Sequence, residues 1–289
     1  MISFPNGKIN IGLNIIRKRP DAYHDLETIF YPIPLSDILE FVPGQSTSFN
    51  SYGEKIPGES HDNICLSAYK LLKADFPSLP PLSIHLFKNI PIGAGMGGGS
   101  SDAAFMLIML NDHFQLGISG AELNVYASKL GSDCAFFIRN RPSFGSGRGE
   151  IVESINLNLT DYSMVLVNPF IPISTGWAYT KINPSGRPSG LKQLIELPLR
   201  EWKDKIGNDF EEPVFRTYPL LKRIKDRFYE KGAIYASMSG SGSALYGIFN
   251  KNSLPDGSAF TDLSRDIHPY SFHNLTASNN SFLSIPESL

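Results

Sequence analysis

The residues with the strongest chemical signal form a glycine-rich stretch, PIGAGMGGGSSDAA, at positions 91–104. Ser100 and Ser101 directly follow the last of its five glycines. Residues 82–87, before the stretch, indicate a strand, and an apolar run over residues 103–110 indicates a helix. Glycine permits positive φ and close approach of the backbone to a ligand, and a helix N-terminus offers free N–H groups with a partial positive charge. The order strand, glycine loop, helix therefore predicts an anion site suited to phosphate, with a purely structural loop as the alternative.

The loop does not match the commoner phosphate-binding motifs. The chain has no Gly-Lys-Ser or Gly-Lys-Thr of a Walker A motif, and it lacks the His-Arg-Asp and Asp-Phe-Gly of protein kinases. Gly93, Gly95 and Gly98 do satisfy G-x-G-x-x-G, but residues 113–118 carry no acidic residue of the kind a dinucleotide fold needs. A dinucleotide-dependent oxidoreductase therefore rests on this short match alone.

A second cluster of glycines and hydroxyls, SMSGSGSA, occupies residues 237–244. Gly240 and Gly242 alternate with three serines, and an apolar strand is expected directly behind them over residues 244–249. Such a segment can form a backbone nest for an anion, or simply a tight turn. Two clusters of this kind in one chain would give a triphosphate two loops to contact.

Two charged residues are candidates for acid–base chemistry. Asp133 lies in LGSDCAFF, so its apolar neighbours predict a partly buried carboxylate that needs a cation or a donor nearby. Lys8 interrupts an otherwise apolar strand and could face the same cleft. The alternatives are a helix-capping or turn aspartate and an exposed lysine of an edge strand. Spacing in the sequence alone does not join the two residues.

Aromatic residues in two turns could stack a nucleobase. Tyr23 and His24 are adjacent in a charged turn, and Trp177 and Tyr179 follow a second turn. Flat rings on loops suit base stacking, but a surface histidine and ordinary packing of a helix start explain the same residues.

The composition bounds the class of protein. The chain has 289 residues, 42% hydrophobic and 19% charged, with a formal net charge of −2. That balance implies no general attraction to nucleic acid or membranes, and no apolar run approaches the roughly 20 residues of a membrane span. The N-terminus has no signal-peptide pattern, and the two cysteines, Cys65 and Cys134, lack metal-ligand spacing. We therefore expect a cytoplasmic protein.

Strands and helices are mixed without a regular β-α-β-α order, which predicts an α+β fold. Strand patterns cover residues 8–16, 26–33, 38–42, 82–87, 135–138, 151–157, 162–168 and 244–249. Helix patterns cover residues 62–73, 103–110, 119–130 and the run from Pro219 to the stop at Gly232. Residues 46–60 read as loop or weak strand, residues 250–289 carry no readable pattern, and a domain boundary is expected near Leu159.

At this point the motifs match a known family. FPNGKINIGLNI, RPDAYHDLETIF, the glycine loop, LGSDCAFF and SMSGSGSALYG stand in the order found in the small-molecule kinases named for galactose, homoserine, mevalonate and phosphomevalonate, the GHMP kinases. The chain resembles them over about residues 2–249. The GGGSS form of the loop and the Lys-Ile-Asn with a downstream Tyr-His pair resemble the branch that acts on an alcohol linked to cytidine diphosphate. Ala22 and Gly7 depart from the usual glycine and alanine, both small-for-small exchanges.

The resemblance implies a two-domain GHMP kinase fold with the active site in the cleft between the domains, residues 1–158 carrying the phosphate loop and residues 159–289 forming the second domain. It implies that Asp133 takes the proton from the substrate hydroxyl and that Lys8 steadies the developing charge. The loop residues matched to ATP are Pro91, Ile92, Gly93, Ala94, Gly95, Met96, Gly97, Gly98, Gly99, Ser100 and Ser101. Those matched to the substrate are Asn10, Tyr23, His24, Phe30, Tyr179, Ser239, Gly240 and Ser241, with His24 and Tyr179 enclosing the base.

The resemblance also implies the ligands. ATP is the expected cofactor, Mg²⁺ arrives with it, and no protein metal ligand is predicted. The expected partner is a small molecule, methylerythritol linked to cytidine diphosphate, with no nucleic acid, membrane or obligate protein partner. A kinase for another small alcohol and an ATP-binding protein without catalysis remain as alternatives.

Overall fold

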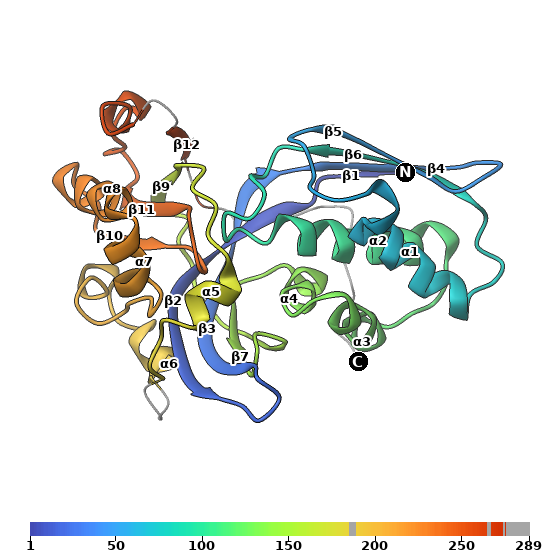
Figure 1. Cartoon of the computed structure of the whole chain (residues 1–289), viewed down its shortest axis with the longest axis horizontal. Coiled ribbons are helices and arrows are strands. Elements are labelled where there is room, and N and C mark those ends of the chain that lie inside the picture. Colours follow the sequence, from blue (N-terminus) through green and yellow to red (C-terminus); the bar gives the residue numbers. More distant parts are fainter. Residues whose placement is uncertain (185–188, 265–266, 274, 276–289) are drawn as a thin grey trace.

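The computed structural model describes residues 1–184, 189–264, 267–273 and 275. Within these ranges the strands form three four-stranded sheets, with strand orders β1-β4-β6-β5, β2-β3-β7-β8 and β10-β11-β9-β12. Helices pack against them from both ends of the molecule, so the predicted α+β class is confirmed (Figure 1). No helix in the described ranges is long and apolar enough to cross a membrane.

The first part of the chain supplies two of the sheets. Its elements are β1 (Ile2–Ser3), β2 (Asn6–Lys18), β3 (His24–Ser36), β4 (Ile38–Pro43), β5 (Ser48–Gly53), the 3-10 turn η1 (Ser60–Asp62), α1 (Ile64–Asp75), β6 (Leu82–Lys88), α2 (Gly98–Phe114), α3 (Gly120–Leu130), α4 (Cys134–Arg139), β7 (Ser143–Ser146) and β8 (Ile151–Ser154). The third sheet and its helices follow as β9 (Tyr162–Asn168), α5 (Thr175–Tyr179), α6 (Leu191–Leu194), η2 (Leu199–Glu201), α7 (Glu211–Thr217), α8 (Pro219–Glu230), β10 (Tyr235–Met238), β11 (Leu245–Asn250), η3 (Gly257–Phe260) and β12 (His268–Phe272).

The long antiparallel pair β2–β3 runs through the middle of the molecule and joins its two halves (Figure 1). Its register pairs Asn10 with Phe30 and Lys8 with Pro32, and it shifts at three irregular points along the strands. Such bulges increase the local twist and redirect side chains. Because β2 also bonds to the segment at residue 208 through a parallel bridge at Leu13, residues from both ends of the sequence reach this pair.

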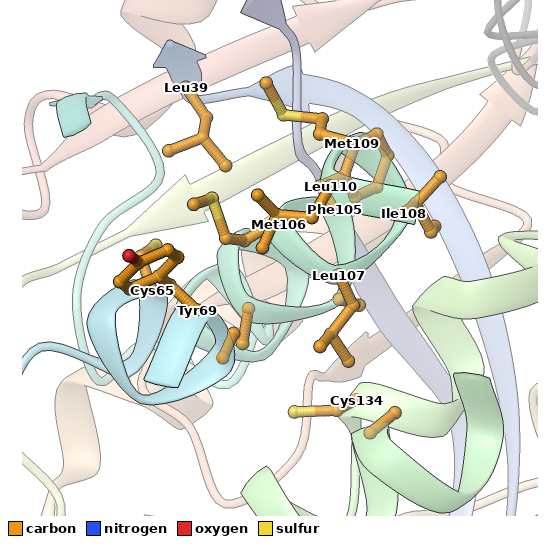
Figure 2. Close-up of a cluster of buried hydrophobic side chains, with 14 of the residues drawn as sticks. Leu39, Cys65, Tyr69, Phe105, Met106, Leu107, Ile108, Met109, Leu110 and Cys134 are labelled. Carbon is orange, nitrogen blue, oxygen red and sulfur yellow. The ribbon is translucent and has the colours of Figure 1, made fainter. Parts of the chain in front are cut away.

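Helix α2 forms the centre of the first core. Every residue from Ser101 to Leu110 is buried, and its side chains lie between Leu39 of β4, Cys65 and Tyr69 of α1, and Cys134 of α4 (Figure 2). A helix that is apolar on all sides is stable only when other elements surround it. This packing fixes the axis of α2, and so fixes where its N-terminal turn points.

Most predicted elements are confirmed, and one is wrong. The capping box of Ser119 and Glu122 opens α3, and α8 begins at Pro219 as its sequence indicates. The predicted strand over residues 135–138 is helix α4, since a short run buried on every side carries no period that separates strand from helix. Residues 48–53 form the parallel strand β5, and the unread tail contributes η3 and β12.

The predicted division at residues 158 and 159 remains a prediction. Leu159 is buried in a core cluster that also holds Ile9 of β2 and Tyr246 of β11. The second predicted domain, residues 159–289, includes residues 185–188, 265–266, 274 and 276–289, which lie outside the described ranges.

Candidate active site

The glycine loop runs from the end of β6 into α2 and needs its glycines at defined points. Gly93, Gly95 and Gly97 have φ values of +69°, +81° and +68°, in the left-handed region that favours glycine. Gly97 is the N-cap of α2, so Gly98 and Gly99 already belong to the first turn of the helix. The expected helix over residues 103–110 therefore begins five residues earlier, at Gly98, and its free N–H groups lie within the loop itself.

The serine–glycine turn between β10 and β11 docks directly on this loop. Ala244 N donates to Ala94 O at 3.2 Å and Ser239 Oγ donates to Gly95 O at 2.8 Å. A Cβ at Gly95 would lie 2.0 Å from Ser239 O, so the contact requires glycine there. The two clusters singled out in the sequence, far apart along the chain, thus form one continuous surface.

Lys8 and Asp133 meet at the edge of this surface. Lys8 Nζ lies 3.3 Å from Asp133 Oδ2, and the lysine side chain is 4% exposed while the aspartate is 32% exposed. Lys8 Nζ also donates to Asn10 Oδ1 at 2.5 Å and to Gly95 O at 3.1 Å. The ammonium is therefore held from three directions, while the carboxylate keeps one side open to solvent and to a substrate.

Asp133 is the N-cap residue of α4, yet its side chain makes no capping hydrogen bond. The carboxylate is therefore directed at Lys8 instead of at its own helix. At the other end of α4, the C-cap residue Asn140 and Asn6 of β2 each donate a side-chain amide hydrogen bond to the other. Since Lys8 is on the same strand as Asn6, this pair fixes the helix that carries the aspartate against the strand that carries the lysine.

A cavity of about 490 Å³ opens on one side of the glycine loop. Its opposite wall comes from Phe49 and Ser51 of β5 and from residues 56–60 and 62–64. Every loop residue predicted for ATP from Pro91 to Ser100 lines it, while Ser101 is fully buried behind the helix turn. No motif marks this wall, which lies in the segment predicted as loop or weak strand over residues 46–60 and in the start of the helix predicted over residues 62–73.

A smaller cavity of about 160 Å³ lies on the other side, beside Lys8 and Asp133. The predicted residues that line it are Lys8, Asn10, Phe30, Asp133, Tyr179, Gly240 and Ser241, joined by Leu13, Leu26, Thr28, Arg148, Gly149, Thr175 and Phe210. Gly95 and Gly97 line both cavities. Lys8 and Asp133 line the smaller cavity only, but Lys8 Nζ contacts Gly95, one of the two residues that line both.

The aromatic residues gather beside the smaller cavity. His24 and Tyr179 stack directly on each other, with ring centroids 4.6 Å apart and planes at 15°. A base held between them would need roughly 7 Å between the rings, so these rings must part to admit it. Burial, with a contribution from Lys18, lowers the pKa of His24. Tyr23 is exposed, and the Arg148 guanidinium covers its ring at 4.8 Å.

Residues 207–211 connect the walls of the smaller cavity, although no motif in the sequence marks them. Asn208 Nδ2 donates to Met238 O at 2.9 Å and to Gly240 O at 2.8 Å, and its Oδ1 accepts from Phe210 N at 2.9 Å. Asp209 Oδ2 accepts from Ile15 N of β2 at 2.7 Å. Phe210 packs edge-on against Tyr179 at 5.0 Å. The segment thus links β2, the serine–glycine turn and the aromatic wall.

The site thus brings together the glycine loop, the serine–glycine turn and the Lys8–Asp133 pair, the motifs on which the resemblance to the GHMP kinases rests. The family models agree: the one for the GHMP kinases N terminal domain matches residues 63–141, and the one for GHMP kinases C terminal matches residues 191–257.

Similarity to individual proteins is more specific. The 4-diphosphocytidyl-2-C-methyl-D-erythritol kinase of Parabacteroides distasonis is 49% identical over 263 residues, covering 91% of this chain and 97% of the relative. That of Bacteroides fragilis is 50% identical over 254 residues, covering 86% and 92%. A crystal structure of 4-(cytidine 5'-diphospho)-2C-methyl-D-erythritol kinase superposes with a TM-score of 0.79 at 29% identity, covering 94% of this chain and 98% of that one. The chain therefore belongs to the 4-diphosphocytidyl-2-C-methyl-D-erythritol kinase family of GHMP kinases.

Proposed function

We propose that this protein transfers the γ-phosphoryl group of ATP to the 2-hydroxyl of 4-diphosphocytidyl-2-C-methyl-D-erythritol, giving the 2-phosphate and ADP, a step of non-mevalonate isoprenoid precursor synthesis. One observation carries the proposal: the Lys8–Asp133 ion pair lines the smaller cavity, and Lys8 contacts Gly95 of the glycine loop, which lines both cavities. A nucleotide in the larger cavity and an alcohol in the smaller one would meet at this pair. The family of the chain supplies the identity of the alcohol.

In this assignment each charged group has one task. Asp133 accepts the proton of the attacking hydroxyl, since its carboxylate is partly exposed and faces the smaller cavity. Lys8 stays charged beside it and stabilises the negative charge that develops between donor and acceptor oxygens. Phosphoryl transfer passes through a loose transition state, so positioning and charge stabilisation supply most of the catalysis. The N–H groups at the start of α2 hold the phosphates from the other side.

We assign the smaller cavity to the cytidyl substrate. Asn10, Phe30, Gly240 and Ser241 line the part next to Lys8, and Ser239 fixes the turn against the glycine loop. Tyr23, His24 and Tyr179 form the aromatic end that takes the base. Arg148, which lines the same cavity and pairs with Glu150 at 3.5 Å, would bind the diphosphate of the substrate. Ser241 Oγ lies 2.9 Å from Thr175 Oγ1, which holds that wall in place.

Magnesium is assigned to ATP and not to a cage of protein side chains. Among the described residues no group of three or more His, Cys, Asp or Glu side chains could hold a metal ion. We assign Mg²⁺ to phosphate oxygens and water because this ion usually keeps several waters and binds through substrate phosphates, and it would supply charge neutralisation on the transferred group. The free, buried thiols of Cys65 and Cys134 support a reducing compartment, and we place the protein in the cytoplasm with no obligate protein partner.

An ADP-release assay tests the proposal. The purified chain receives Mg²⁺-ATP with 4-diphosphocytidyl-2-C-methyl-D-erythritol or, in parallel, with mevalonate, homoserine or galactose. We expect turnover with the cytidyl substrate alone. Turnover with another alcohol would leave the Lys8–Asp133 chemistry in place and reject the aromatic cavity as a cytidine site. Absence of turnover with every alcohol, together with tight ATP binding, would favour a nucleotide-binding protein without catalysis.

A further inference from the structure

Three charged side chains that the proposed chemistry does not use are buried together behind the glycine loop. Lys88, the last residue of β6, donates from Nζ to Asp102 Oδ2 at 2.8 Å and forms a second ion pair with Asp37 Oδ2. The side chains of Lys88, Asp37 and Asp102 are only 4%, 0% and 2% exposed. Burying a charge costs desolvation free energy that only close pairing offsets, so a buried cluster of three charges indicates a specific structural or functional role.

The place of the cluster suggests that reason. Asp102 lies in the second turn of α2, and both Asp102 and Lys88 line the larger cavity. Lys88 Nζ would be 3.2 Å from a Cβ on Gly98, the first residue of α2. Asp37 Oδ1 accepts from the backbone N–H groups of Asn89 and Ile90 at 2.6 and 2.8 Å. The cluster therefore links the chain entering the glycine loop to the helix that leaves it.

The two carboxyl groups are not equivalent. Asp37 accepts three hydrogen bonds, two from backbone N–H groups and one from Lys88, as an ionised carboxylate does. Asp102 accepts only from Lys88, and its buried Oδ1 has no hydrogen-bond partner in the described part of the chain. Burial raises the pKa of Asp102; attraction from Lys88 opposes this rise, and the neighbouring Asp37 adds to it.

We propose that Lys88, held between Asp37 and Asp102, is a positioning residue that fixes the glycine loop and the first turn of α2 for the triphosphate of ATP. The inference rests on the proposed function only in assigning the larger cavity to ATP. Glycines at 93, 95, 97, 98 and 99 leave this loop with many accessible conformations. Because the N–H groups must be aimed before the nucleotide binds, a clamp that joins both ends of the loop would raise nucleotide affinity.

Direct nucleotide binding tests the role of Lys88 without relying on turnover. In the double variant Lys88→Met/Asp37→Asn the ammonium leaves together with one of its two carboxylate partners, so Asp37 does not remain as an unpaired buried charge. We expect calorimetric affinity for ADP to fall about tenfold or more, and KM for ATP to rise in proportion while KM for the cytidyl substrate changes less than about twofold. Lys129→Met, an exposed lysine of α3, is the matched control. Unchanged ADP affinity, or an equal rise in both KM values, would overturn the proposal.

Two substitutions of Asp102 test whether Lys88 needs a neutral or an ionised partner at this position. Asp102→Leu keeps the side chain's size but removes its hydrogen bond to Lys88, and we expect ADP affinity to fall about tenfold. Asp102→Asn retains a neutral acceptor for Lys88 and should restore affinity to within about threefold of the unaltered chain. If the asparagine variant binds ADP as weakly as the leucine variant, an ionised Asp102 is required and the assignment is wrong. Loss of turnover with normal ADP binding in the unaltered chain would instead count against the proposed function alone.

Discussion

The two cavities on either side of the glycine loop are built in opposite ways. The larger is lined mainly by two continuous stretches of chain, residues 90–100 and 56–60. The smaller draws its lining from β2, β3, the start of α4, residues 148–149, α5, residue 210 and residues 240–241. A local loop preceding a helix suffices to hold phosphates, which every nucleotide shares, whereas recognition of one alcohol needs side chains brought together by the whole fold.

The difference predicts how each side fails. Substitution of Lys8 or Asp133, which we call the boundary between the two sides, should abolish the reaction while leaving both ligands bound. Changes to the scattered residues should weaken binding of the cytidyl substrate and spare ATP. Substitutions in the cluster of Lys88, Asp37 and Asp102 behind the glycine loop should weaken binding of ATP and spare the cytidyl substrate.

The largest effect is expected at the boundary, from Asp133→Asn. A general base contributes about 10²–10⁴-fold to proton transfer, so kcat should fall by that factor. Asp133 makes no capping hydrogen bond and is partly exposed, so the fold should not depend on it. Steady-state kinetics with both substrates varied checks the prediction, and the expected result is KM values within about threefold of the unaltered chain. A variant with normal kcat would remove Asp133 from the chemistry.

A smaller and one-sided effect is expected from Asn208→Ala. The substitution leaves Met238 O and Gly240 O without their donor and Phe210 N without its acceptor, which frees the wall of the smaller cavity. We expect KM for the cytidyl substrate to rise about tenfold or more, since small misplacements of a wall are costly to binding and orientation. KM for ATP should change less than about threefold. Asn14→Ala, which removes only a 3.4 Å contact to Asp209, is the control, and equal shifts in both KM values would contradict the division into two sides.

A still smaller effect is expected from His24→Ala. Loss of one aromatic face is worth about 0.5–1.5 kcal/mol, so KM for the cytidyl substrate should rise about two- to tenfold with kcat retained. The ring's depressed pKa keeps it neutral and able to stack near pH 7.5. His85→Ala, on the outer face of β6, serves as control. Because His24 and Tyr179 contact each other directly here, unchanged substrate affinity would mean that the two rings only pack together.

The same contrast explains what the sequence could predict. The glycine loop, the capping box of α3 and the start of α8 are encoded by residues adjacent in the chain, and all three are present. The run at residues 135–138 was misread because burial on all sides removes the periodicity on which such readings depend. Burial of this kind is a property of the packed molecule and is invisible in a local window.

The site divides along the same line. Lys8 and Asp133 could be identified singly, but their 3.3 Å contact depends on α4 docking against β2. Asn208 and Lys88 carry no local signal, because each is a polar residue of the kind usually found on the surface. Only the folded structure shows that Asn208 donates to two carbonyl groups and that Lys88 is buried between two aspartates. Resemblance to a family singled out Lys8 and Asp133, whereas the positioning roles that we propose for Asn208 and Lys88 required the structure.

The smallest expected effect concerns stability behind the glycine loop and separates the two sides by pH. Burial raises the pKa of Asp102, while the carboxyl of the unfolded chain ionises near its usual pKa of about 3.9. Below that value both states are protonated and the group's contribution to stability is fully present; as pH rises through the raised pKa of the folded state that contribution is lost.

Asp102→Asn cannot ionise, so its melting temperature should match that of the unaltered chain near pH 4 and exceed it by about 2 °C, or about 1 kcal/mol, near pH 8. Lys88, Asp37 and the buried thiol of Cys65 are the titratable groups that face Asp102, and each remains in the variant. Melting curves across this range, with Asp133→Asn as the comparison from the other side of the loop, check the sign: a variant that loses stability relative to the unaltered chain as pH rises would show that Asp102 is ionised in the folded protein.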